Sequence, residues 1–184
     1  MSGLSPAESI ILAIDTSKEA DAEKLAKVAQ EAGARFVKLG LELSSATSWR
    51  YCSDLAAAHN LDWVADAKLD DIPNTVVGAV KNISALAHPP FGITMHTTAG
   101  IEAMRTAQKA AGPIKMLGVT VLTSISAETD GEGEKLYHVP VRQKVMELAR
   151  DAVRAGLGGI VSSPLEVGLI KGDPETQQLF AMIP

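Results

Sequence analysis

Short runs of apolar residues alternate along the chain with longer segments in which apolar residues recur every three or four positions. A short apolar run is typical of a strand that is buried on both faces, and the longer periodicity is typical of an amphipathic helix. Strands are therefore predicted at residues 10–14, 36–40, 61–65, 92–96, 114–122, 159–162 and 179–183.

Helices are predicted between these strands. The first ends near Gly33, and either Thr16 or Ser17 can cap its start. Further helices are predicted at residues 48–59, 74–87, 100–111, 140–155 and 164–171, and residues 124–137 are predicted to form a polar loop.

Strands that alternate with helices predict right-handed crossovers and a parallel sheet. A strand and a helix alternate six times before a final strand, which indicates the α/β class and a (β/α)₈ TIM barrel. Such a barrel normally needs about 200 residues or more, and this chain has 184. We therefore expect one barrel domain over residues 1–184 that is truncated after strand seven, either as a fragment or naturally.

Composition narrows the class of protein. Apolar residues make up 46% of the chain and charged residues 21%, as in ordinary globular proteins. The net charge of −5 argues against nucleic-acid binding, although local lysines can still attract a small anion. A single cysteine, Cys52, excludes an internal disulfide and favours a cytoplasmic location. The sequence contains no stretch of 18 apolar residues, so no membrane span is predicted. Residues 1–9 do not resemble a secretory signal.

Polar residues are expected to gather at one edge of the barrel. Active sites of such barrels lie at the carboxyl ends of the strands. Five successive strand ends carry polar residues: Asp15, Lys38, Asp66 with Lys68 and Asp71, His96, and Thr123 with Ser124. We therefore predict the active site at this edge.

The third strand end holds a dense group of charges. Alternation along a strand places Asp66 and Lys68 on the same face. Asp71 lies just beyond, where it can turn back or reach a neighbouring subunit, before Pro73 starts a helix. Charged groups at a buried strand end are costly to desolvate unless they are paired and used. A structural ion pair that caps the strand is the alternative interpretation.

Residues 66–75, Asp-Ala-Lys-Leu-Asp-Asp-Ile-Pro-Asn-Thr, closely resemble the signature of the orotidine 5'-monophosphate decarboxylase family. Residues 13–15, 37–43, 95–100, 119–124 and 159–164 are similar to other blocks of that family, in the same order. The resemblance covers essentially the whole chain. It implies decarboxylation of orotidine 5'-monophosphate to UMP and carbon dioxide, the last step of de novo pyrimidine synthesis.

The resemblance also implies a catalytic network. Lys38, Asp66, Lys68 and Asp71 would form an alternating Lys-Asp-Lys-Asp array, with Asp71 contributed across a homodimer interface. Lys68 would stabilise and then protonate a carbanion at C6 of the pyrimidine. Asp66 would lie against the departing carboxylate.

Further residues would bind the substrate. The resemblance implies that Asp15 binds the ribose, that Thr75 reaches the neighbouring subunit's nucleotide, and that Thr123 or Ser124 contacts the pyrimidine. For His96, contact with the substrate and a purely structural role are equally favoured. No cofactor or metal is expected, because the four histidines show no ligand spacing.

The sequence departs from the family pattern at two places. Asp70 adds a second carboxylate beside Asp71, which would disturb the network only if Asp70 faced inward. The chain ends at Pro184, where the family's phosphate-binding segments would begin.

Two alternative functions stay open. One is a metal-dependent phosphosugar lyase of the hexulose-phosphate synthase type, which shares Asp-x-Lys-x-x-Asp but lacks Ile-Pro-Asn-Thr. The other is a truncated, non-catalytic barrel that binds a nucleotide.

Overall fold

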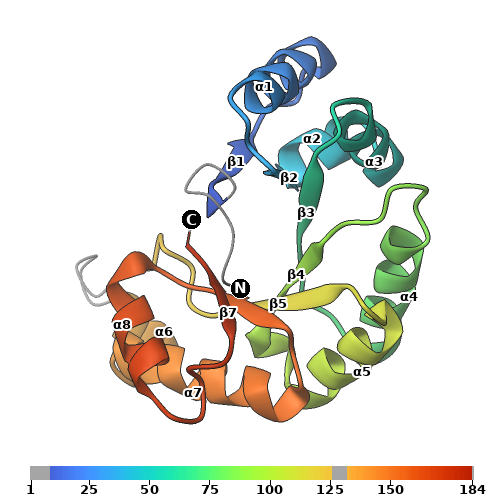
Figure 1. Cartoon of the computed structure of the whole chain (residues 1–184). Helices are drawn as coiled ribbons and strands as arrows, with labels where there is room; N and C mark the ends of the chain where they lie inside the picture. Colours follow the sequence, from blue (N-terminus) through green and yellow to red (C-terminus); the bar gives the residue numbers. More distant parts are fainter. Residues whose placement is uncertain (1–8, 126–131, 184) are drawn as a thin grey trace. The chain divides into compact units, whose positions relative to one another are not determined.

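The computed structural model describes residues 9–125 and 132–183 (Figure 1). Its strands are β1 (Ile11–Ile14), β2 (Phe36–Gly40), β3 (Asp62–Leu69), β4 (Gly92–His96), β5 (Lys115–Val119), β6 (Gly159–Val161) and β7 (Phe180–Met182). Its helices are α1 (Glu19–Glu31), α2 (Leu41–Ala46), α3 (Trp49–Ala58), α4 (Pro73–Ser84), the 3-10 turn η2 (Thr97–Ala99), α5 (Ile101–Ala111), α6 (Glu132–Tyr137), α7 (Val141–Ala155) and α8 (Pro164–Gly172).

The strands of the described residues form one sheet in chain order, β1-β2-β3-β4-β5-β6-β7. Pairing is parallel between β1 and β2, β2 and β3, β5 and β6, and β6 and β7. Parallel strands in sequential order, joined through helices, are the arrangement of a (β/α) barrel. The predicted α/β class and TIM-barrel fold are confirmed.

The chain divides into two compact units. The first comprises Met1–Ala67 with Ala79–Ile93, and the second comprises Lys68–Gly78 with Thr94–Pro184. That residues 1–184 form a single domain stays a prediction.

The hydrophobic core of the first unit includes side chains of strands β1 to β3. Trp63 of β3 is fully buried and its ring stacks on Trp49 of α3, with the ring centroids 6.4 Å apart. The indole Nε1 donates a hydrogen bond to the carbonyl oxygen of His88 at 3.0 Å. A large apolar side chain whose one polar atom has a partner is a favourable core residue. This packing fixes β3, the strand that carries the charged stretch.

The second unit is stabilised around β5 and β6. Its fully buried side chains include Met104, Met116, Leu117 and Ile160, and each such burial contributes about 1.5–3 kcal/mol. The side chain of Gln108 on α5 accepts hydrogen bonds from the backbone N–H groups of Met116 and Gly158. One amide group therefore links α5 to the starts of two neighbouring strands.

The local predictions were correct for most elements and wrong at several ends. Neither Thr16 nor Ser17 caps α1, because Lys18 is its N-cap and the Thr16 hydroxyl accepts from the Lys18 N–H. The short helix α2, the turn η2 and the helix α6 were not predicted. The loop predicted at 124–137 is helical from Glu132 onward, and residues 126–131 lie outside the described residues. β3 continues to Leu69, whereas β5 ends at Val119 rather than at residue 122.

A membrane span was not predicted. In the described parts of the chain, no helix combines the length and apolar character needed to cross a bilayer.

Candidate active site

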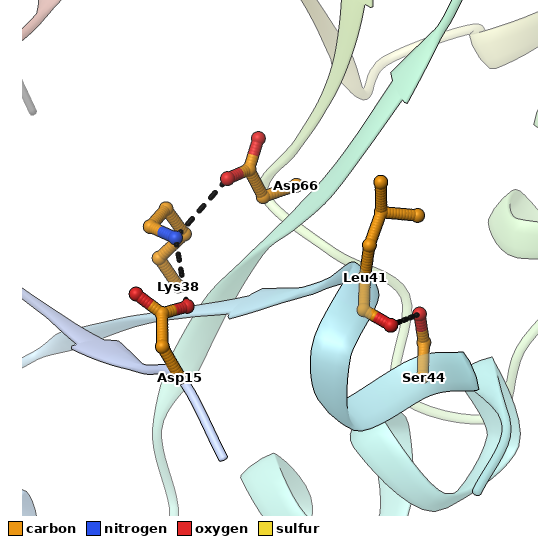
Figure 2. A network of polar contacts seen from close by, with 5 residues as sticks. All are labelled: Asp15, Lys38, Leu41, Ser44 and Asp66. Carbon is orange, nitrogen blue, oxygen red and sulfur yellow. Dashed lines mark hydrogen bonds and ion pairs between the residues drawn. The ribbon is translucent and has the colours of Figure 1, made fainter. Parts of the chain in front are cut away.

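A lysine on β2 lies between two carboxylates, one directly after β1 and one on β3 (Figure 2). Asp15 follows β1 directly, Lys38 is the middle residue of β2, and Asp66 lies in the second half of β3. Gly40 is opposite Asp66 in the parallel register, so the long side chain of Lys38 reaches Asp66 by extending along the strand. Lys38 Nζ donates to Asp66 Oδ2 at 3.1 Å and to Asp15 Oδ1 at 3.2 Å. Two carboxylates therefore hold one ammonium.

The three charged groups differ in their exposure to water. The side chain of Asp66 is 8% exposed, that of Lys38 20% and that of Asp15 58%. Burial lowers the pKa of Lys38, but the charges and hydrogen bonds of Asp66 and then Asp15 outweigh it, so the pKa is raised above 10.5. Lys38 is therefore an ammonium at neutral pH. Its partner Asp66 is fixed and largely shielded from solvent, where electrostatic interactions are strongest.

Gly40 leaves space beside this cluster. A Cβ atom on Gly40 would lie 3.6 Å from Asp15 Oδ1 and 3.8 Å from Lys38 Nζ. Those are ordinary contact distances, so a methyl group fits there.

Lys68 has an unusual backbone. Although it belongs to β3, its φ is 45°, in the left-handed region. A residue with a side chain pays about 1–3 kcal/mol in such a conformation, and such residues gather at functional sites. The alternation of a regular strand therefore does not by itself set the direction of the Lys68 side chain, and the expectation that Lys68 and Asp66 share a face stays a prediction. The backbone N–H of Lys68 donates to Thr94 Oγ1 at 2.9 Å.

Asp71 and Thr75 lie on either side of the start of α4. Asp71 is exposed, and its Oδ1 accepts a hydrogen bond from the backbone N–H of Ile72 at 2.7 Å. Thr75 is exposed in the first turn of α4, and the intervening Ile72 is 66% exposed. Asp70 is exposed too. The expected position of Asp71 and Thr75 at a dimer interface stays a prediction.

The remaining predicted residues follow β4 and β5. His96 ends β4, is partly buried and precedes η2. Thr123 and Ser124 are exposed in the turn that follows β5. With Lys68, Asp71 and Thr75, they belong to the second unit. Asp15, Lys38 and Asp66 belong to the first unit, where they are joined directly.

Sequence reasoning missed two residues that lie next to predicted ones, Gly40 beside Lys38 and Thr94 beside Lys68. Gly40 lies inside a block similar to the family, but nothing in its pattern indicates that it faces the charges. Thr94 is fully buried in the middle of β4, where a β-branched residue is ordinary.

Within residues 9–125 and 132–183, no three His, Cys, Asp or Glu side chains are grouped so that they could hold a metal ion.

The chain is similar to known decarboxylases. Residues 8–184 match the model of the orotidine 5'-phosphate decarboxylase / HUMPS family. The orotidine 5'-phosphate decarboxylase of Anaeromyxobacter dehalogenans is 42% identical over 171 residues, which cover 91% of this chain and 72% of that protein. The orotidine 5'-phosphate decarboxylase of Parasynechococcus marenigrum is 36% identical over 188 residues, covering 97% of this chain and 73% of that protein.

Solved structures have the same fold. The crystal structure of orotidine 5'-phosphate decarboxylase from Lactobacillus acidophilus matches with a TM-score of 0.82 and 29% identity, covering 95% of this chain and 80% of that one. The Methanocaldococcus jannaschii orotidine 5'-monophosphate decarboxylase complexed with the inhibitor BMP matches with a TM-score of 0.77, covering 95% of this chain and 76% of that one. At 22% identity, this second match supports the fold alone.

Proposed function

We propose that this chain, which belongs to the orotidine 5'-phosphate decarboxylase / HUMPS family, is a carboxy-lyase that converts orotidine 5'-monophosphate to UMP and carbon dioxide. The curated relatives named above carry that activity in their names. The observation within this chain that supports the proposal best is the ammonium of Lys38 held between Asp15 and Asp66.

The reaction needs electrostatic stabilisation. When the bond from C6 to the carboxylate breaks and carbon dioxide leaves, an electron pair with little resonance relief remains on C6. A fixed positive charge is therefore the main source of stabilisation. An ammonium about 4 Å from that carbon contributes on the order of 4 kcal/mol at an effective dielectric near 20.

Lys68 is the residue that we assign to this charge. Its ammonium would lie near C6, stabilise the carbanion and give up one proton to C6, after which water would protonate the amine again. Its left-handed φ of 45° is the kind of backbone outlier that gathers at active sites. Lys68 would then be both the electrostatic partner of the carbanion and its proton donor.

Lys38 and the aspartates would orient the network. The buried Asp66 would face the departing carboxylate, and Lys38 would keep Asp66 in place and charged. The more exposed Asp15, which contacts the same ammonium, would bind the ribose hydroxyls.

A second copy of the chain would complete the site. Asp71 would join the network of the neighbouring subunit and Thr75 would contact its nucleotide. The exposed Ile72 between them suits burial in a homodimer interface. For His96 and for Thr123 or Ser124, contact with the substrate stays a prediction.

A turnover assay tests the proposal. Purified protein is incubated with orotidine 5'-monophosphate, with and without a chelator, and UMP is measured by chromatography. We expect UMP to form at the same rate in both samples. Turnover that the chelator abolishes would contradict the metal-free chemistry proposed above. Absence of UMP in both samples, from a folded protein, would refute the proposed activity and favour one of the two alternatives, a metal-dependent phosphosugar lyase or a non-catalytic nucleotide-binding barrel.

A further inference from the structure

We infer that Thr94 is a positioning residue that holds the backbone of Lys68 in its left-handed conformation and so fixes the origin of the lysine side chain. This inference rests on the proposed function, because it gives the lysine the role assigned above. It concerns a hydroxyl group that the family signature does not include.

The conformation of Lys68 is distinctive within the chain. Three non-glycine residues of the described parts have positive φ, namely Asn60, Lys68 and His138. Asn60 follows α3 and His138 follows α6, so both lie in turns, where such conformations are common. Lys68 alone of the three lies in a strand. A lysine has no intrinsic preference for this region, so the surrounding structure must impose the conformation.

Thr94 is placed to impose it. In a regular parallel ladder the N–H of a strand residue donates to a backbone carbonyl of the neighbouring strand. The N–H of Lys68 donates to a side chain, Thr94 Oγ1, at 2.9 Å. Thr94 lies on the next strand, β4, and is fully buried. A buried β-branched side chain has few rotamers, so its hydroxyl is a fixed acceptor.

The backbone conformation decides where the ammonium can lie. The Cα–Cβ bond of Lys68 changes direction if φ returns to the extended region, and the flexible side chain magnifies that change at Nζ. Misplacing a reacting group by about 1 Å can lower the rate about a hundredfold. Molecules in the wrong backbone conformation would bind substrate but not turn it over, so kcat would fall in proportion to the competent fraction.

The first test compares substitutions of Thr94. Thr94→Val removes the acceptor and keeps the shape, whereas Thr94→Ser keeps the hydroxyl. The matched control is Thr176→Val, because Thr176 is also fully buried but donates its hydroxyl hydrogen to the Ile170 carbonyl, well along the chain from Lys68. Each variant is assayed with orotidine 5'-monophosphate for kcat and KM.

We expect Thr94→Val to lower kcat by about tenfold to a hundredfold, with KM changed by less than about threefold. Thr94→Ser should recover most of the lost kcat, and Thr176→Val should retain the kcat of the natural protein. If Thr94→Val does not fold by circular dichroism, Thr94→Ala replaces it with the same expectation. An unchanged kcat in the hydroxyl-free variant, or an equal loss in Thr176→Val, would overturn the inference.

A second measurement does not depend on turnover. Hydrogen exchange of the Lys68 amide, followed by NMR, reports directly on the hydrogen bond to Thr94. We expect exchange at Lys68 to be at least about tenfold faster in Thr94→Val than in Thr94→Ser or Thr176→Val. That result would support the backbone role even if orotidylate were not turned over, in which case the proposed function alone would be wrong. Equal exchange rates in all variants would overturn the inference.

Discussion

Asp66 and Asp15 allow a direct comparison of a buried and an exposed partner of the same cation. Both carboxylates contact Lys38 Nζ at nearly the same distance, 3.1 Å and 3.2 Å, but their side chains are 8% and 58% exposed. Replacing each by asparagine keeps the shape and removes the charge. A larger loss of stability in Asp66→Asn than in Asp15→Asn is therefore expected from the burial of Asp66.

The expected magnitudes follow from the geometry. At 3.1 Å and an effective dielectric near 20, the attraction between Lys38 and Asp66 is about 5 kcal/mol before desolvation is counted. Desolvation of the carboxylate offsets a large part of this attraction. Lys38 also keeps Asp15 in the Asp66→Asn variant. Replacing the charged acceptor of one hydrogen bond to the ammonium by a neutral amide then costs at most about 1.5–3 kcal/mol. The exposed Asp15 should contribute less than about 1 kcal/mol.

Urea denaturation at pH 7, followed by tryptophan fluorescence, measures both variants on one scale. We expect Asp66→Asn to lower the free energy of unfolding by at least about 1 kcal/mol more than Asp15→Asn does. A double variant should show coupling, because both carboxylates contact the same ammonium. If Asp66→Asn were as stable as Asp15→Asn, or more stable than the natural protein, the desolvation cost would exceed the attraction and our electrostatic reasoning would be wrong.

Two further predictions concern stability. Because the pKa of Lys38 is raised in the folded state, its stabilising effect is complete below pH 10.5 and is lost as the pH rises through the higher folded pKa. The free energy of unfolding should therefore fall above pH 10.5 less steeply in Lys38→Met than in the natural protein, and equal slopes in urea titrations would contradict this. A Cβ on Gly159 would lie 2.5 Å from the carbonyl oxygen of Phe180, so Gly159→Ala should cost about 1–3 kcal/mol. Gly168→Ala in α8, with no atom within 4 Å of the new Cβ, should be neutral or stabilising by up to about 1 kcal/mol. If Gly159→Ala were as stable as Gly168→Ala, the predicted clash would be wrong.

The sequence predicts most of the fold because its apolar pattern is local. Buried parallel strands need continuous apolar runs, and the helices between them need an apolar stripe, so both leave a readable period. The elements that were missed have little such pattern. Residues Leu41–Ala46 form a helix too short to show a period, and it begins directly after β2 without a side-chain cap.

The candidate site, like the fold, could be predicted from the sequence only in part. The rule that polar residues gather at strand ends named Asp15, Lys38 and Asp66, which the structure joins by ion pairs. It could not reveal the left-handed backbone of Lys68, because no local preference of lysine favours that conformation and the hydrogen bond that accompanies it goes to a side chain of the neighbouring strand. Tertiary contacts of this kind carry no signal in the order of neighbouring residues.

The most direct test of the central claim is the rate of orotidylate decarboxylation by the natural protein and by Lys68→Ala, measured side by side with circular dichroism of both. We predict that the natural protein forms UMP and that Lys68→Ala keeps the fold but loses turnover, because it lacks both the cation near C6 and the proton donor. A near-natural rate in folded Lys68→Ala would contradict the claim that this ammonium stabilises and protonates the carbanion.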